Sequence, residues 1–523
     1  MITNAIEIEK KIVNRNPATG EVVSEHFIAT VDDVHAAVVR ARAAQPAWNA
    51  LGVARRVEIL RKFQVLLLND RDALARKITA EAGKPLVESM LSEILVALEA
   101  ARFCAENAYR VLRSEDVPHG NPIMKTKRGR LVYDPLGVIG IISPWNYPFS
   151  IPATETLAAL VTGNAVVLKP SELTPVSALE LQRLLHAAGV PKDVFAVVLG
   201  EGPTGAALIE SPIDKLIFTG SVSTGKRVAE TAARRLLPVV LELGGKDAMI
   251  VLDDADLDVA SSAAVWGAMM NAGQTCLSVE RCYVHRGVYS RFIAFCVEKI
   301  QRLKVGQGSD ASTDIGPLIS ESQLQIVESQ VEDARALGAN ILAGGKRLPE
   351  LGPQFYAPTL VTDVTSSMKL MREETFGPVL PVVPFSIDDE AVSLANASEF
   401  GLAASIFTKD SKRGESMARR LNAGAVMIND LISCFAMPEA PHGGTRASGI
   451  GRTHGLMGLR EMVRPKYIDF DRLPGMKKVW WYPYGEVFTR QMSAFVDMLF
   501  APTLVKKLSG SLKSAGSLRR KKL

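Results

Sequence analysis

The stretch VIGIISPWNYP, at residues 138–148, opens a series of short apolar runs rich in β-branched residues. Each run is followed by turn residues and then by a helical stretch. The series continues with AVVLK (165–169), VFAVVLG (194–200), KLIFTG (215–220), VVLELGG (239–245) and AMIVLDD (248–254). Continuous apolar strands that alternate with helices are typical of parallel strands buried on both faces of a sheet. This part of the chain therefore predicts an α/β fold.

The sequence on either side extends this prediction. Residues 31–115 place apolar side chains at helical spacing, as in Val57, Leu60, Phe63 and Leu67. The strand–helix alternation resumes after residue 280, with CYVH (282–285), ANILAGG (339–345), VLPVVPF (379–385), ASIFT (404–408) and AVMIND (425–430). A chain of 523 residues is too long for one typical domain. Two α/β halves are the simplest account of the pattern.

Charge and cysteine content limit the class of protein. Residues 475–523 carry ten basic and two acidic residues, a net charge of +8, which leaves −3 for residues 1–474 of the total of +5. A mildly acidic body gives no case for nucleic-acid binding. The N-terminus has no apolar signal segment, and the five cysteines show no zinc-ligand spacing. We therefore expect no metal site, free thiols and a cytoplasmic chain.

Cys276 is the candidate nucleophile. It ends the segment NAGQTC (271–276), where it follows a glycine-containing turn and polar residues. A thiolate is the best side-chain nucleophile near neutral pH if its surroundings stabilise the anion. A single cysteine is more often a buried structural residue, so the interpretation depends on the residues that accompany it.

Two polar residues follow predicted strands and could serve such a nucleophile. Glu242, in LELGGK (241–246), ends a buried strand beside two glycines, where a general base could activate water. The alternative is an ion pair with Lys246. Asn146, in PWNYP (144–148), lies between two prolines and could donate to a developing oxyanion. The alternative there is an ordinary turn asparagine.

Dinucleotide binding is suggested by two further segments. FTGSVSTGK (218–226) follows a strand and opens a helix, so that Gly220, Ser221 and Gly225 could hold a pyrophosphate at a helix N-terminus. VVLKPSE (166–172) ends a strand with Lys169 and Glu172, which could reach ribose hydroxyls. A carboxylate there repels a 2′-phosphate and favours NAD, with NADP as the alternative.

In sequence order, eight segments resemble the aldehyde dehydrogenase superfamily over residues 14–470. They are NPATGE (16–21), PWNYP (144–148), KPSE (169–172), FTGSVSTGK (218–226), LELGGK (241–246), NAGQTC (271–276), EETFGPV (373–379) and PHGGTRASGIGR (441–452). The resemblance implies that Cys276 is the nucleophile, Glu242 the base and Asn146 the oxyanion donor. It also implies a cofactor site made by Trp145, Lys169, Glu172, Gly220, Ser221, Gly225, Leu243, Glu374 and Phe376.

The same resemblance implies a fold with three parts and a homodimer or homotetramer. Residues 1–116 and 136–244 would form a Rossmann-like NAD-binding domain, and residues 245–445 a catalytic α/β domain. Residues 117–135 and 461–473 would form a small β-arm for oligomerisation. A basic amphipathic tail would follow over residues 474–523.

The expected substrate class depends on the residues at two positions near the nucleophile and the oxyanion donor. Family members that act on succinic semialdehyde resemble one another in having arginines where this chain has Met270 and Thr154. Apolar residues flank the nucleophile and occupy a nearby loop: Trp266, Met269, Met270, Leu277, Leu431, Ile432, Phe435 and Met437. They favour a long-chain, aromatic or terpenoid aldehyde, although some could be ordinary core residues.

The tail carries aromatic residues and positive charge. VWWYPY (479–484) is followed by a helical apolar pattern over 487–499, by Pro502, and by the low-complexity stretch 508–523, which we expect to be disordered. No uncharged run reaches the length of a membrane span. We expect residues 479–523 to lie on an anionic membrane surface, so that the chain would be peripheral at the inner face of a membrane. The alternative is a helix that covers the substrate tunnel or a partner subunit.

Three other functions stay open from the sequence. One is a succinate-semialdehyde-type enzyme, and another is a CoA-acylating aldehyde dehydrogenase, a branch that typically lacks the base seen here as Glu242. The third is a non-catalytic, membrane-associated family member, which would be expected to lose Cys276, Glu242 or Asn146.

Overall fold

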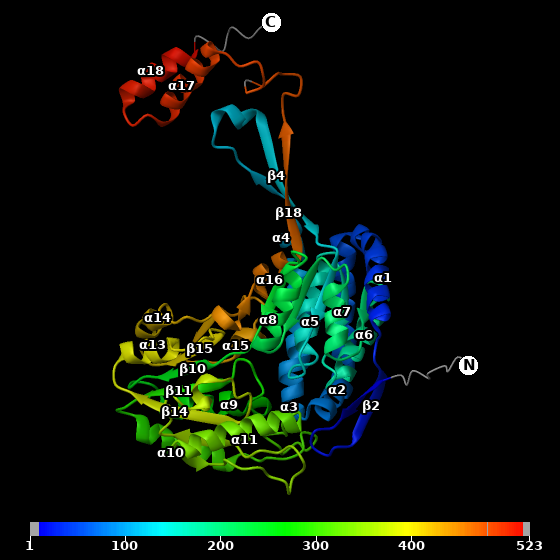
Figure 1. The fold of residues 1–523 in the computed structure, drawn as a ribbon, viewed down its shortest axis with the longest axis vertical. Coiled ribbons are helices and arrows are strands. Elements are labelled where there is room, and N and C mark those ends of the chain that lie inside the picture. Colours follow the sequence, from blue (N-terminus) through cyan, green and yellow to red (C-terminus); the bar gives the residue numbers. More distant parts are fainter. Residues whose placement is uncertain (1–9, 479, 516–523) are drawn as a thin grey trace, which may run out of the picture. The chain divides into compact units, whose positions relative to one another are not determined.

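A computed structural model describes residues 10–478 and 480–515 of the chain. It divides into two compact units, which are described separately. The first consists of the chain up to Ser114 together with Val132–Lys466, and the second of Glu115–Leu131 together with the chain from Tyr467 onward. Figure 1 shows the elements of each unit as a ribbon.

The first sheet of the larger unit holds the strands predicted between 138 and 242. Its order is β17-β9-β8-β5-β6-β7, with β17 antiparallel to β9 and the others parallel. The strands are β5 (Val138–Ile142), β6 (Ala165–Lys169), β7 (Phe195–Val197), β8 (Lys215–Thr219), β9 (Val239–Glu242) and β17 (Gly449–Ile450). The predicted alternation of buried parallel strands and helices is confirmed here, and β17 comes from a distant part of the sequence.

Helices cover this sheet, and α5 is buried along its whole length. All twelve residues of α5 (Ser150–Val161) are buried against β5, β6 and neighbouring helices. The others are α1 (Val31–Ala50), α2 (Gly52–Ala82), α3 (Leu86–Glu88), η1 (Ser89–Leu95), α4 (Val96–Leu112), α6 (Pro175–Ala188), α7 (Gly202–Glu210), α8 (Val222–Ala233) and α16 (Gly455–Glu461). The helical prediction for residues 31–115 is confirmed. A hairpin of β1 (Lys11–Arg15) and β2 (Val22–Phe27) precedes them.

A second sheet forms the other half of the larger unit. Its order is β12-β13-β14-β11-β10-β15-β16, parallel except between β12 and β13. The strands are β10 (Asp247–Val251), β11 (Val279–His285), β12 (Asn340–Ala343), β13 (Thr359–Thr362), β14 (Val379–Phe385), β15 (Ala403–Phe407) and β16 (Ala425–Ile428). Its helices are α9 (Leu257–Met269), η3 (Met270–Gly273), α10 (Tyr289–Arg302), α11 (Glu321–Ala336), α12 (Lys369–Arg372), α13 (Asp388–Asn396), α14 (Ser411–Ala418), α15 (Ser433–Ala436) and η4 (Arg446–Ser448). Each sheet has its own hydrophobic core, as two α/β halves require.

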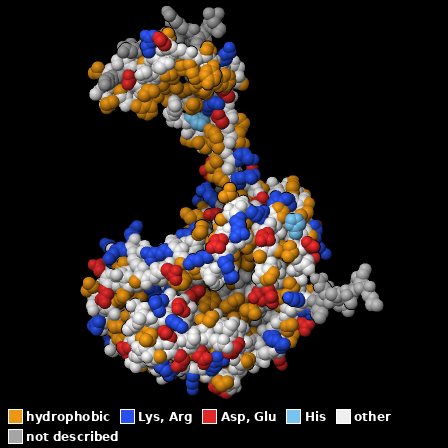
Figure 2. All heavy atoms as spheres, viewed as in Figure 1, with side chains coloured by type: hydrophobic (Ala, Val, Ile, Leu, Met, Phe, Trp, Pro, Cys, Tyr) orange, Lys and Arg blue, Asp and Glu red, His pale blue; other side chains and the backbone are white. Residues whose placement is uncertain are grey.

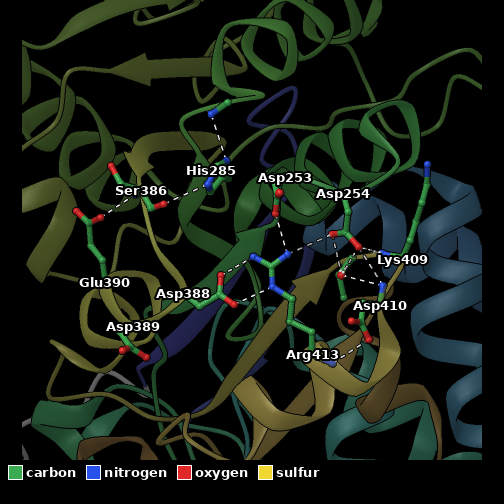
Figure 3. A network of polar contacts seen from close by, with 12 residues as sticks. Asp253, Asp254, His285, Ser386, Asp388, Asp389, Glu390, Lys409, Asp410 and Arg413 are labelled. Atoms are coloured by element: carbon green, nitrogen blue, oxygen red, sulfur yellow. Dashed lines mark hydrogen bonds and ion pairs between the residues drawn. The ribbon is translucent and has the colours of Figure 1, made fainter.

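An ion-pair network around Arg413 joins the loops that follow β10 and β15 to two helices of the second sheet (Figure 3). Arg413, on α14, binds both carboxylate oxygens of Asp388 at 2.7 and 2.6 Å, and binds Asp253 at 2.8 Å. Asp254 accepts from the Thr408 hydroxyl at 2.8 and 2.9 Å. A planar guanidinium suits this two-point contact, so the loop after β10 and the starts of α13 and α14 are held together.

The smaller unit combines strands with a helical hairpin. A three-stranded sheet has the order β18-β4-β3, from β3 (Glu115–Val117), β4 (Lys127–Pro135) and β18 (Val463–Asp471), with η2 (Pro122–Thr126) between the first two. Helices α17 (Glu486–Phe500) and α18 (Leu504–Ala515) then pack against each other. The helix predicted over 487–499 is confirmed. Disorder was predicted for 508–523 and is wrong for 508–515, because α18 pairs with α17; residues 516–523 lie outside the described part.

Candidate active site

Residues from the ends of β5, β8 and β9 surround a cavity of about 280 Å³ in the larger unit. The carboxyl ends of parallel strands are where open α/β sheets bind ligands. The cavity brings together nine of the twelve predicted site residues. Its lining consists of Pro144, Trp145, Asn146, Ile151, Thr219, Gly220, Ser221, Glu242, Leu243, Gly244, Cys276, Gln323, Ile326, Glu374 and Phe376.

Cys276 reaches this cavity at the end of a strained turn. Asn271, Ala272 and Gly273 have φ angles of 52°, 54° and 73°, a left-handed run that reverses the chain after α9. Cys276 is only partly buried, whereas the other four cysteines are buried. Burial raises the pKa of the Cys276 thiol well above its ordinary value, and nearby carboxylates add to the effect. The thiol must therefore give its proton to a base when it attacks.

Asn146 is fixed beside the turn that carries Cys276. Its Nδ2 donates to the carbonyl of Gln274 at 3.1 Å. Its own backbone carbonyl accepts from Lys84 Nζ at 2.7 Å and from Asn271 Nδ2 at 3.1 Å. These bonds hold the amide at the cavity wall that Cys276 also lines.

Glu242 is buried at the end of β9 with its carboxylate facing both the cavity and a smaller space behind it. Among the described residues neither carboxylate oxygen has a hydrogen-bond partner, and His442 Nε2 lies 3.8 Å from Oε2. Burial raises the pKa of Glu242 well above its ordinary value, and Glu155 adds to this effect only in its ionised form. The alternative partner Lys246 is paired with Glu280 instead. A buried carboxyl group with a raised pKa suits a general base near neutral pH.

The other cavity residues form surfaces that fit a dinucleotide. The rings of Trp145 and Phe376 meet edge to face with centroids 5.4 Å apart. Ser221 caps the N-terminus of α8 by accepting from Thr224 N at 3.3 Å, which leaves a helix end suited to phosphate oxygens. Glu374 accepts from Gly245 N at 2.9 Å. The residues therefore fit a bound NAD or NADP by chemistry and placement.

Three predicted cofactor residues lie outside the cavity lining. Lys169 and Glu172, at and after the end of β6, form an ion pair at 3.3 Å. Gly225 lies in the first turn of α8, where a Cβ atom would approach the Leu243 side chain to 2.4 Å. Its role in the structure is to let α8 pack against the segment that follows Glu242.

Sequence reasoning missed several residues around Glu242. Glu155 on α5 and His442, Thr453 and His454 line a small cavity behind the base together with Glu242 and Cys276. A carboxylate inside the apolar helix SIPATETLAALV was the one available signal for Glu155. The histidines come from a segment that only tertiary structure brings to β9.

Comparison with known proteins identifies the family. The sequence model of the Aldehyde dehydrogenase family matches residues 4–468. A Mycolicibacterium smegmatis protein provisionally named succinate-semialdehyde dehydrogenase (NADP(+)) is 39% identical over 495 residues, 94% of this chain and 93% of that protein. The 4,4′-diapolycopene aldehyde oxidase of a Methylomonas species is 38% identical over 488 residues, 93% of this chain and 90% of that protein.

Solved structures agree. An NAD-dependent aldehyde dehydrogenase from Sinorhizobium meliloti has a TM-score of 0.87 and 37% identity, covering 90% of this chain and 93% of its own. The NAD+ complex of an aldehyde dehydrogenase from Bacillus cereus has a TM-score of 0.85 and 37% identity, covering 88% and 93%. The predicted family and fold are confirmed. The chain belongs to the aldehyde dehydrogenase family and is an NAD(P)-dependent aldehyde dehydrogenase.

Proposed function

We propose that this enzyme oxidises an apolar aldehyde to its acid through a thioester on Cys276. The observation that carries the chemistry is the single cavity lined by Cys276, Asn146 and Glu242. Cys276 adds to the aldehyde carbon, and its proton goes to Glu242. The Asn146 amide donates to the oxygen that becomes negative. Bound NAD(P) supplies the acceptor for the hydride that leaves this carbon.

Glu242 then completes the reaction. After it has released the thiol proton to solvent, it removes a proton from a water molecule, whose oxygen attacks the thioester carbonyl as the bond to Cys276 Sγ breaks. The acid leaves and the thiolate is restored. Because Glu242 is present, this proposal favours hydrolysis over transfer of the acyl group to CoA.

The cysteine variant tests this assignment directly. Cys276→Ala should abolish NAD(P) reduction by aldehydes while cofactor binding, followed by fluorescence titration, is retained. Glu242→Gln should instead accumulate an acyl adduct on Cys276, visible as a mass increase of the intact chain. Cys434→Ala is a control, because Cys434 is buried in the same core. Turnover by the Cys276→Ala variant would contradict the proposal.

An apolar substrate is supported by the residues at the two informative positions. Met270 is buried in the core against which Cys276 packs, and the Thr154 hydroxyl donates to Ser150 O at 2.8 Å. Lys84 is bound by Glu93 and by the Asn146 carbonyl, and Arg452 by the carbonyls of Gly444 and Gly451. Each of these cations is therefore already engaged, which disfavours a substrate carboxylate.

The named relatives divide between the two substrate classes. One is named for succinic semialdehyde and the other for a long polyene aldehyde. Met270 and Thr154 favour the second class, since a carboxylate buried beside them would lack a charged partner. Leu431 and Ile432 are buried in the core against which Cys276 packs, which adds apolar surroundings to the nucleophile.

A substrate panel separates the two classes. Turnover of decanal should exceed that of hexanal at least tenfold in kcat/KM, because four additional CH₂ groups can contribute up to about 3 kcal/mol. Succinic semialdehyde should be the poorest substrate. Met270→Arg should improve succinic semialdehyde and impair decanal, with Met457→Arg, an exposed methionine elsewhere, as the matched control. A preference of the unmodified enzyme for succinic semialdehyde would reject the apolar assignment.

We also propose that the helical hairpin α17–α18 lies on an anionic membrane surface. Large apolar side chains are strongly exposed on it: Val487, Val496, Phe500, Leu504, Val505 and Leu508 are 55–77% exposed. Figure 2 shows hydrophobic side chains gathered on the surface of this unit. Trp481, Tyr482 and Tyr484 precede the hairpin and are 53–83% exposed. Among residues 10–478 and 480–515, no helix is long and apolar enough to cross a membrane. An interfacial helix pair with basic flanks fits this composition.

Liposome sedimentation tests the membrane proposal. The full chain should sediment with phosphatidylserine-containing vesicles and less with neutral ones, and a chain ending at Asp471 should stay in the supernatant. The triple change Phe500→Ser, Leu504→Ser and Val505→Ser should reduce sedimentation, whereas Val39→Ser and Leu68→Ser, also exposed, should not. Equal behaviour of all variants would instead favour the alternative, a cover over a tunnel or a subunit.

The assembly proposal rests on the three-stranded sheet. Its outer strand β18 exposes most of its residues, and a strand edge readily pairs with another chain. We propose a homodimer or homotetramer built through this arm. Light scattering should give two or four times the mass of one chain, and a monomeric mass would contradict the proposal.

A further inference from the structure

A second, smaller cavity lies behind Glu242. Its volume is about 20 Å³, which is enough for one water molecule. Glu155 of α5, Glu242 of β9 and His454 all contribute to its wall. This space shares Glu242, Leu243 and Cys276 with the larger cavity, and no step proposed so far uses it.

Three side chains around this space have polar atoms without a partner. Glu155 Oε2, both oxygens of Glu242 and His454 Nδ1 are buried and make no hydrogen bond within the described residues. Buried polar atoms are nearly always paired in folded proteins. A single ordered water can satisfy two to four such atoms, and these atoms surround one water-sized space.

The other oxygen of Glu155 shows how its carboxyl is oriented. Oε1 accepts from the Thr219 hydroxyl at 3.2 Å, so Oε1 is occupied as an acceptor and Oε2 is the oxygen that can carry a proton. Oε2 is left as the O–H donor toward the small cavity. Burial raises the pKa of both carboxyl groups, that of Glu155 to about 8, so this pair holds a proton at neutral pH.

We propose that Glu155 is a positioning residue that stays in its acid form and donates, through one water in this cavity, to the Glu242 carboxylate. The water accepts from Glu155 Oε2–H and donates to one oxygen of Glu242 and to His454 Nδ1, so each of the three side chains gains a partner. With this donor in place, Glu242 ionises before Glu155 as the pH rises, and it can then act as base. This inference rests on the proposed role of Glu242.

Other charged and titratable groups face this pair. The pKa of His442 is lowered to about 4 and that of His454 to about 3 by burial, so both rings are neutral at pH 7. Arg452 favours an ionised Glu242. Cys104 of α4 lies beside Glu155 at a further small cavity, and burial raises its pKa to about 12. These groups keep one charge state through neutral pH. Cys276 also lines this space, but it carries the acyl group during deacylation, so a pH effect on that step reports the two glutamates.

The test is the pH profile of deacylation. p-Nitrophenyl acetate acylates a reactive thiol directly, so hydrolysis of the acyl-enzyme can be followed without cofactor on the full chain. Glu155→Leu removes the donor, so the acid limb should move to higher pH by about one unit or more, with about a tenfold slower rate at pH 7. Glu155→Gln keeps an N–H donor and should stay within about threefold of the unmodified rate.

Controls make each result decisive. Glu81→Gln removes another fully buried glutamate, on α2, and should leave the profile unchanged. If Glu155→Leu does not fold, His454→Phe, which removes the acceptor that holds the water, should move the limb in the same direction. The inference is overturned if the acid limb of the pH profile does not shift in Glu155→Leu or His454→Phe. It is also overturned if Glu155→Gln shifts this limb as far as Glu155→Leu does. A failure of the proposed function is distinct, because the unmodified enzyme would then form no acyl-enzyme on Cys276.

Discussion

Glu242 is deeply buried, and within the described part of the chain its carboxylate has no hydrogen-bond partner. This affects the pH dependence of the reaction. Its pKa is raised, so the base is protonated at a pH where an exposed glutamate would be ionised. The rate of acyl-enzyme hydrolysis should therefore rise with pH, with its acid limb clearly above 4.5. Stopped-flow measurements between pH 4.5 and 9 check this. A flat rate over that range would mean that Glu242 is not the base.

Asn146 is expected to act mainly on the transition state. Asn146→Ala should lower kcat about 10²–10³-fold, because one preorganised oxyanion donor is lost. Cofactor affinity should change little, since the amide donates to Gln274 O and not to the cofactor surfaces. Steady-state kinetics and a fluorescence titration measure the two effects. A variant that loses affinity and keeps kcat would place Asn146 in binding instead.

Glu172 is expected to determine the preference for NAD over NADP. Its carboxylate pairs with Lys169, and a negative charge there disfavours the 2′-phosphate of NADP. Glu172→Ser should raise kcat/KM for NADP relative to NAD at least tenfold. Lys169→Ala should weaken both cofactors, which serves as the comparison. An unchanged ratio in the serine variant would show that neither residue reaches the ribose.

The turn between α9 and Cys276 determines where the nucleophile lies. Gly273 has a φ of 73°, and a Cβ atom there would lie 2.0 Å from the carbonyl oxygen of Gly377. Gly273→Ala should cost at least about 1–3 kcal/mol from backbone strain and about 10²-fold in kcat from displacement of Cys276. Gly338→Ala is the control, because φ is 93° but nothing lies within 4 Å. Equal effects of the two would exclude a positioning role for the turn.

At the scale of elements, local patterns predicted much of the fold. Buried parallel strands read as continuous apolar runs, so β5, β6, β8, β10 and β15 were evident from composition. The motif residues at strand ends were found for the same reason. Pairing between distant segments was not predictable, and it is this pairing that places β17 beside β9 and His454 beside Glu155. Helix α18 was missed because its polar sequence gains order by packing on α17. The domain boundaries stay a prediction.

The whole molecule buries several carboxyl groups that prefer the neutral form, and this affects stability. Burial raises the pKa of both Glu81 and Glu155 to about 8. Such a group binds its proton more tightly in the folded protein than in the unfolded chain. Its contribution to the free energy of unfolding is therefore fully present below about pH 4.5 and is lost as the pH rises through 8. The free energy of unfolding should fall over this window by about 1.4 kcal/mol per pH unit for each group. Urea unfolding at pH 6 and pH 9 measures this, and Glu81→Gln should flatten the dependence. Stability that grows with pH would contradict it.

The unequal exposure of the five cysteines makes the chain suitable for quantitative labelling. Cys276 alone is partly open, and the other four are enclosed in the two cores. A small alkylating reagent applied to folded enzyme should therefore be consumed at one equivalent per chain, whereas unfolded enzyme takes five. The equivalents consumed by the folded enzyme count the active centres with a reactive Cys276 in any preparation. The difference from the equivalents consumed after unfolding measures how much of the sample is folded.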